Sequence, residues 1–62
     1  MHPLTGVAVQ NLAGLYKAEA RYDEANVLYK RALAIFEQSL GPDSPEVGSA
    51  LDALSSMYAM EG

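Results

Sequence analysis

The sequence predicts an all-α chain of three helices, and two observations carry this prediction. In three segments separated by short breaks, apolar residues recur three and four positions apart, which places them on one side of an α-helix. No segment shows the strict apolar–polar alternation that indicates a strand. Half of the 62 residues are apolar, which is ordinary for a globular chain and too high for a disordered one. We therefore expect a single helical unit over residues 1–62.

The first helix is expected at residues 3–19. Pro3 suits a first helical turn, where a backbone N–H has no helical partner, and His2 is expected to act locally at this helix start. One apolar stripe follows at helical spacing: Leu4, Ala8, Leu12 and Leu15. The break after this helix, near Ala20, is weakly marked because no Gly or Pro stands there.

The second and third helices are expected at residues 22–40 and 45–60. Asp23 and Glu24 fall in the first turn of the second helix, where the helix dipole favours anions. Gly41 and Pro42 end that helix, and Ser44 offers an N-cap oxygen for the next one. The third helix presents two apolar stripes, one of Val47, Leu51, Leu54 and Tyr58 and the other of Ala50, Ala53, Met57 and Met60.

The chain contains an internal repeat with a period of 42 residues. Shifting the sequence by 42 positions aligns twenty residues, of which six are identical. The identical pairs are Pro3/Pro45, Gly6/Gly48, Ala8/Ala50, Leu12/Leu54, Tyr16/Tyr58 and Glu19/Glu61. Chance would give about one or two identities, so the chain reads as about one and a half copies of a repeating unit.

Composition excludes several classes of partner. Four basic residues stand against eight acidic ones, giving a net charge of −4 with no basic run, so nucleic acid is not expected as a partner. No apolar run approaches the roughly 20 residues of a membrane-spanning helix, and the N-terminus does not read as a signal peptide. The absence of cysteine is compatible with a reducing compartment.

Several short segments together resemble a known family of helical repeats. Leu12-Ala13 with Tyr16, Tyr22-Asp23-Glu24-Ala25, Tyr29 and Arg31-Ala32-Leu33 resemble a tetratricopeptide repeat, a helix–turn–helix unit with small residues where its helices touch. The 42-residue period and the segment Leu40-Gly41-Pro42-Asp43-Ser44-Pro45 are similar to the variety found in kinesin light chains. The resemblance implies three antiparallel helices (helix A, helix B and the next helix A) of a right-handed superhelix. In the family Gly usually separates the two helices of a unit, so Ala20 departs from the pattern and costs about 1 kcal/mol if its φ is positive.

The resemblance also implies a function, the binding of a peptide or partner helix on a concave face lined by the A helices. Transferred to this sequence, the concave-face positions are Gln10, Asn11, Gly14 and Lys17 on the first helix, with Asp52 and Ser56 on the third. Asn11 is the most suggestive, because its amide can both donate to and accept from a peptide backbone. The alternative is that Asn11 is only a solvated polar residue.

A second function, self-association, follows from the energetics of a small chain. Apolar burial is worth about 85 kcal/mol, against about 90 kcal/mol of ordering entropy, so an isolated unit has little margin. We expect two apolar flanks to remain uncovered and to favour a homo-oligomer by stacking or by helix exchange: Leu4, Ala8 and Leu15 on the first helix, and Ala53, Met57 and Met60 on the third. The alternative is that Met57 and Met60 are flexible core residues.

Catalysis has little support in this sequence. A nucleophile needs a nearby base, and the single histidine, His2, lies at the N-terminus. No glycine pattern suits a phosphate, and no His, Asp and Glu cluster has the spacing of metal ligands. We therefore predict a protein that is not an enzyme, with no catalytic residue, metal or cofactor.

Overall fold

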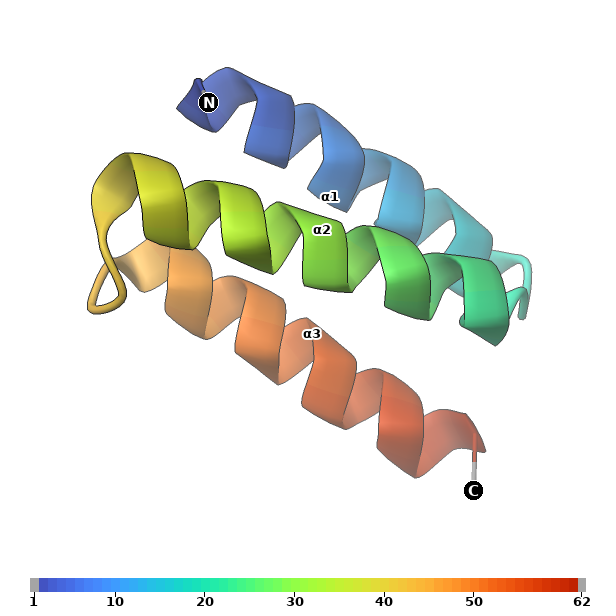
Figure 1. Ribbon diagram of the computed structural model, residues 1–62. Helices are drawn as coiled ribbons and strands as arrows, with labels where there is room; N and C mark the ends of the chain where they lie inside the picture. The colour runs from blue at the N-terminus through green and yellow to red at the C-terminus, as the bar shows by residue number, and fades with distance from the viewer. Residues whose placement is uncertain (1, 62) are drawn as a thin grey trace.

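Three helices make up the part of the protein that the computed structural model describes, residues 2–61. They are α1 (Pro3–Ala18), α2 (Tyr22–Leu40) and α3 (Pro45–Glu61), and no strand occurs within this range (Figure 1). The prediction of an all-α chain with three helices is therefore confirmed. The predicted unit also included Met1 and Gly62, which lie outside the described residues.

The middle helix of the chain is also the middle helix of the fold. In Figure 1 the helices run in alternating directions, and both α1 and α3 pack against α2 while hardly touching each other. The Cα atoms span 30 × 18 × 13 Å, so the three helices form an elongated, flat layer. Each outer helix therefore has one side against α2 and other sides open.

The turn between α1 and α2 is held by backbone hydrogen bonds and requires a left-handed residue. The Ala20 N–H donates to the Lys17 carbonyl at 3.0 Å, and the Arg21 N–H donates to the Tyr16 carbonyl at 2.9 Å. These two bonds define a Schellman motif, whose residue after the C-cap takes a positive φ and is usually Gly. Here that residue is Ala20, with φ of 62°. The condition under which Ala20 was expected to be costly, a positive φ at this turn, is therefore met.

The starts of α1 and α3 are capped by the two side chains that were expected there. His2 Nδ1 accepts a hydrogen bond from the Leu4 N–H at 3.1 Å, and Ser44 Oγ accepts one from the Val47 N–H at 3.4 Å. Gly41, with φ of 93°, ends α2 and turns the chain toward α3. Local sequence signals thus set where the helices begin and end.

The core is built along one stripe of α2. Ala25, Tyr29, Ala32 and Phe36 follow at helical spacing and are buried between the two outer helices. Two clusters form around this stripe: Ala13, Ala25, Tyr29, Leu54 and Met57 in one, and Ala32, Phe36 and Val47 in the other. Small residues alternate with aromatic ones, which lets the helices approach closely around large side chains.

The closest approach of α1 to α2 occurs at Gly6. A Cβ atom at this position would lie 2.7 Å from Phe36 Cε1 and 3.1 Å from Ile35 Cγ2. Both α2 side chains are fully or almost fully buried, so neither can move away easily. Gly6 therefore forms a notch on α1 that the ring of Phe36 fills.

The structure corrects the expected orientation of α3. The buried residues of this helix are Val47, Ala50, Leu54 and Met57, which draws on both predicted stripes. Met57, predicted to lie on an uncovered flank, has no exposed surface, whereas Leu51 and Tyr58 are about half exposed. Apolar residues surround most of α3, so their spacing alone did not show which side meets α2.

Candidate binding surfaces

The 42-residue repeat shows that α1 and α3 use different sides to contact α2. Ala50, Leu54 and Met57 are buried against α2, but their repeat equivalents on α1, Ala8, Leu12 and Leu15, are exposed. We call Leu4, Ala8, Leu12 and Leu15 the open face of α1. Leu12, which belongs to the predicted apolar stripe of the first helix, is exposed because α1 has a helix on one side only.

On a second side of the two helices, the residues of α1 are covered and the equivalent residues of α3 are exposed. Gly6, Val9, Ala13 and Tyr16 of α1 are buried or half-buried beside α2, and their repeat equivalents on α3 are all exposed. Those equivalents are Gly48, Leu51, Ser55 and Tyr58, which we call the outer face of α3. The two surfaces follow from chain order, because α1 precedes α2 and α3 follows it.

The predicted self-association residues are divided by this geometry. Leu4 and Leu15 are 69% and 56% exposed, and Ala8 and Met60 are also exposed. Ala53 is half-buried and Met57 is buried in the core. The predicted flank on α1 therefore exists, whereas the predicted flank on α3 lies largely on the inner side, against α2.

The predicted concave-face residues fall on corresponding sides of the two outer helices. Gln10 and Asp52 are repeat equivalents, as are Gly14 and Ser56. Asn11, Asp52 and Ser56 are exposed, and Gln10, Gly14 and Lys17 are half-buried. A Cβ atom at Gly14 would lie 3.7 Å from the Tyr29 hydroxyl, which places Gly14 near the buried stripe of α2.

The structure also reveals a surface hollow that the sequence reasoning missed. It has a volume of about 380 Å³ and is lined by Tyr16, Asp23, Glu24, Val27 and Leu28. Val27 is more than half exposed, which is unusual for a β-branched apolar residue within a helix. The only sequence signal for this hollow was Val27 itself, which stands outside the buried stripe of α2.

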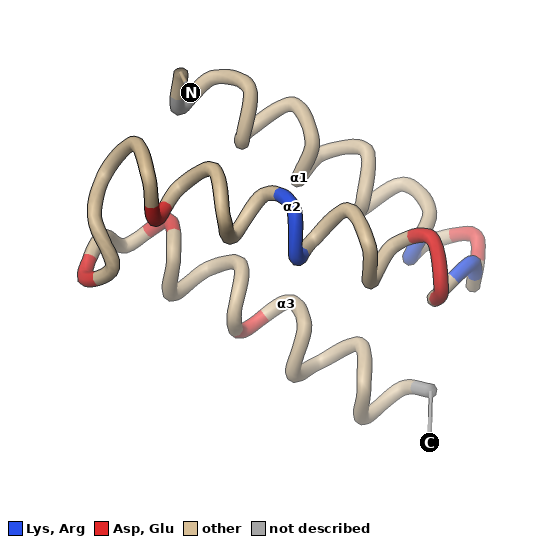
Figure 2. Tube along the Cα trace, viewed as in Figure 1, with Lys and Arg blue, Asp and Glu red and all other residues tan. Residues whose placement is uncertain are grey.

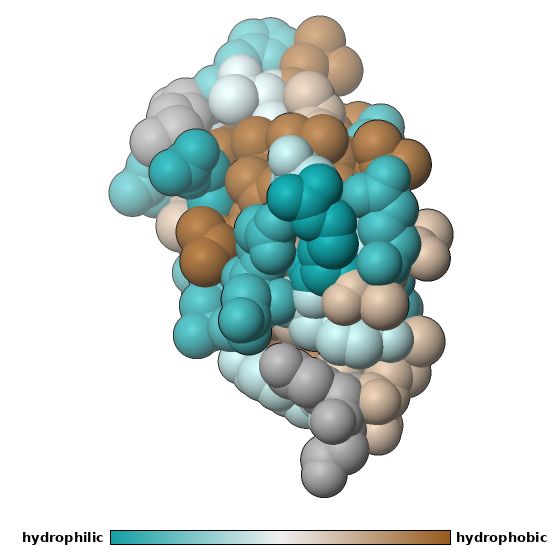
Figure 3. Space-filling model, turned by 90° about the vertical axis from the view of Figure 1, so that its right-hand side faces the viewer, coloured by the Kyte–Doolittle hydropathy of each residue, from teal (hydrophilic) through white to brown (hydrophobic). Residues whose placement is uncertain are grey.

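A small ionic cluster lies at the same end of the molecule. The Arg21 guanidinium lies 4.8 Å from the centre of the Tyr16 ring and pairs with Glu19 at 3.6 Å and with Glu24 at 2.5 Å. The hydrogen bond and charge of Glu24 raise the pKa of Arg21 above its ordinary value. Figure 3 views this end of the molecule and shows hydrophilic residues gathered at its centre with apolar patches beside them.

Charge is distributed unevenly over the three helices. Figure 2 shows basic positions on α2 and near the first turn, whereas the charged positions on the described part of α3 are acidic. Glu46 and Asp52 are both exposed on α3. The charge on the described surface of α3 is therefore negative.

The described residues contain neither a membrane-spanning helix nor a cluster of metal-ligating side chains. Within residues 2–61 none of the three helices has the length and apolar character needed to span a bilayer. Over the same range no group of three or more His, Cys, Asp and Glu side chains is placed to hold a metal ion.

Comparison with protein-family models gives the family. A model described as tetratricopeptide repeat matches residues 5–62, which is nearly the whole chain. This chain belongs to the tetratricopeptide repeat family. No curated protein and no solved structure matches closely enough to serve as a relative. Tetratricopeptide repeats are generally non-catalytic scaffold motifs that mediate protein–protein interaction.

In this repeat, α1 and α2 are the helix pair of one unit and α3 is equivalent to α1. Ala13, Ala25 and Ala32, the small residues of the segments that resemble the family, are all fully buried, as the resemblance implies for residues where the helices touch. Ala20 occupies the turn position at which the family usually has Gly, and it does so with a positive φ.

Proposed function

We propose that this tetratricopeptide repeat is a non-catalytic protein-binding module that receives a peptide or partner helix on a concave face formed by α1 and α3. One observation supports this proposal above the others. Asn11 of α1 and Asp52 and Ser56 of α3 are exposed on two helices that flank α2 and hardly touch each other. We also propose that the repeat is of the 42-residue variety, on the strength of its internal period.

The chemistry of these positions suits an extended or helical peptide. Asn11 can donate to and accept from a peptide backbone, and Ser56 can do the same more weakly. Asp52 favours a cationic side chain on the ligand and disfavours a C-terminal carboxylate. Gly14 leaves the ligand room to approach the α1 backbone.

The experiment uses a peptide selected from a random 12-residue display library against the 62-residue chain. Titration of the ¹⁵N-labelled chain is expected to shift the amide signals of Asn11, Gly14, Asp52 and Ser56. Asn11→Ala is expected to weaken binding about fivefold, because it removes one net hydrogen bond of about 1 kcal/mol. Gln38→Ala, at an exposed position on α2, is the matched control and should leave the affinity unchanged. Signals that shift only outside α1 and α3 would contradict the proposal.

A second candidate function, self-association, is favoured by the open face of α1. The accessible surface of 3778 Å² is close to the roughly 3,900 Å² that scaling gives for a compact 6.6 kDa chain, so the total surface is not enlarged. What is unusual is its content, since several large apolar side chains are exposed on one side of a single helix. Light scattering after size exclusion, over a concentration series, tests this candidate. A mass of about 6.6 kDa at every concentration refutes it.

A further inference from the structure

Tyr29 of α2 carries a hydroxyl group that the packing of the described chain does not use. The residue is 5% exposed and belongs to the cluster that joins the three helices, with Ala13 of α1 and with Leu54 and Met57 of α3. Its hydroxyl makes no hydrogen bond to any residue within 2–61. A phenylalanine ring would fill the same space in this core, so helix packing alone does not account for the oxygen atom.

This hydroxyl reaches the surface of the molecule beside Gly14 of α1. In the described part of the chain, every buried side-chain nitrogen or oxygen has a hydrogen-bond partner. Because the Tyr29 hydroxyl has none, it belongs to the small part of the residue that meets solvent. A Cβ atom at Gly14 would lie 3.7 Å from this hydroxyl, which is the nearest atom outside α1. The hydroxyl is therefore reached through space that a side chain at position 14 would narrow.

The surroundings of Gly14 place the hydroxyl between α1 and α3. Gln10 and Lys17, the concave-face candidates one turn to either side of Gly14, are half-buried as it is. On α3, Ala53 is half-buried and packs against the cluster that contains Tyr29. Small residues thus stand on both outer helices, Gly14 on one and Ala53 on the other, where another chain can come close to the hydroxyl.

We infer that the Tyr29 hydroxyl is a ligand-binding group of the concave face, and that it donates a hydrogen bond to a main-chain carbonyl oxygen of an extended peptide bound at Gly14. This inference rests on the proposed function, because it places the peptide on the face formed by α1 and α3. It adds a binding group that comes from α2, the helix on which both of them pack. It also specifies the ligand atom, which is present in a peptide of any sequence.

The chemistry of an extended peptide supports this assignment. Such a peptide has main-chain carbonyl groups without partners of its own, and a carbonyl that loses water on binding needs a donor from the protein. A phenolic O–H can supply that donor. The Tyr29 hydroxyl gives up no hydrogen bond within residues 2–61 when it does so, and its ring is held in the core before the ligand arrives.

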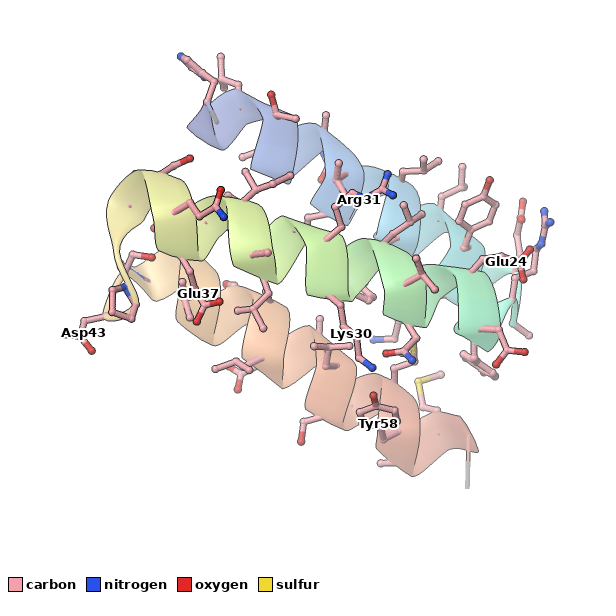
Figure 4. All side chains as sticks on the ribbon, in the orientation of Figure 1. Glu24, Lys30, Arg31, Glu37, Asp43 and Tyr58 are labelled. Carbon is pink, nitrogen blue, oxygen red and sulfur yellow. The ribbon has the colours of Figure 1, made fainter. Side chains whose placement is uncertain are left out.

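The test measures the affinity of three library-selected 12-residue peptides of unrelated sequence for the 62-residue chain, by fluorescence anisotropy. Tyr29→Phe removes only the oxygen and should weaken the binding of each peptide about fivefold without lowering the melting temperature. Tyr58→Phe is the matched control, with the same chemical change at a hydroxyl that donates to Asn26 Oδ1 at 3.1 Å. Figure 4 shows Tyr58 on α3, on the side from which Lys30 of α2 projects. The affinity of the Tyr58→Phe chain should therefore be unchanged.

Two further measurements locate the contact. Gly14→Ala should weaken binding about fivefold by placing a methyl group beside the hydroxyl, and should raise the melting temperature because Ala is the better helix former. The loss should be smaller when Tyr29→Phe is already present, since both substitutions act on one contact. With ¹³Cζ-labelled tyrosine, peptide binding should shift the Tyr29 signal and leave the Tyr58 signal in place.

The outcomes separate this inference from the function on which it rests. If Tyr29→Phe leaves all three affinities unchanged while Asn11→Ala weakens them, the inference is overturned and the concave-face proposal stands. If only one peptide is affected by Tyr29→Phe, its acceptor is a side chain and the main-chain assignment is wrong. A lower melting temperature for Tyr29→Phe would give the hydroxyl a structural role and overturn the inference as well. Affinities that respond to neither substitution contradict both proposals.

Discussion

Replacing Ala20 with Gly should stabilise this protein, although Gly normally weakens a folded chain. Ala20 holds φ of 62° at the position of the Schellman motif where only Gly is free of steric cost. A left-handed conformation costs an L-residue about 1–2 kcal/mol. Gly also makes the unfolded chain more flexible, which offsets about 0.4–1 kcal/mol of this gain. The difference between the middles of the two ranges gives a net stabilisation by Ala20→Gly of about 0.8 kcal/mol.

Circular dichroism at 222 nm during thermal and urea unfolding measures this effect. For a chain of 62 residues, about 1 kcal/mol corresponds to roughly 4–8 °C, so the melting temperature should rise by about 3–6 °C. Ala34→Gly is the matched control, because Ala34 is exposed in the middle of α2. It makes the same chemical change with the same effect on the unfolded chain, and should destabilise the protein by about 1 kcal/mol. If Ala20→Gly lowers the melting temperature as Ala34→Gly does, the reasoning from the turn geometry is refuted.

Three further predictions concern the core, a helix cap and the uncovered apolar face. Phe36→Ala should remove about 3–5 kcal/mol and abolish the cooperative melting transition, because its ring fills the space between all three helices; a transition within a few degrees of the original would contradict this. Ser44→Ala should cost about 1 kcal/mol in urea unfolding, through loss of the acceptor for the Val47 N–H, with Ser49→Ala as the uncapped comparison. Met57→Glu should unfold the chain, because it places a charge in the core. Leu15→Glu, at an exposed position, should leave the circular dichroism unchanged and weaken any self-association measured by light scattering.

Much of the architecture could be predicted from short stretches of sequence. Helix starts and ends depend on groups within a few residues of each other, such as the Ser44 hydroxyl and the Val47 N–H, and those signals are visible in the sequence. The strain at Ala20 was also foreseeable, since it follows from one residue type at one turn position. The repeat period, seen in pairs such as Gly6 and Gly48, gave the equivalence of α1 and α3.

The candidate surfaces were less accessible to sequence reasoning. Met57 was assigned to an uncovered flank because its stripe is as apolar as the stripe of Leu51 and Tyr58. Helical spacing tells which residues share a side, but it does not tell which of two apolar sides meets a neighbour. The hollow beside Val27 and Tyr16 joins residues of two helices, so no single stretch of the chain contains its signal.

By itself, the sequence determined the three helices and their caps, because these depend on local chemistry. It also determined that the chain contains about one and a half copies of a repeat, because that follows from similarity along the chain. Only the tertiary structure decided which side of each helix is buried. The equivalent residues Gly6 and Gly48 show the physical reason. The space beside Gly6 is filled by the Phe36 ring because α2 lies on that side of α1. The space beside Gly48 is open because α2 lies on a different side of α3. Chain order and helix packing, rather than residue type, make Gly6 a core contact and leave Gly48 exposed on α3.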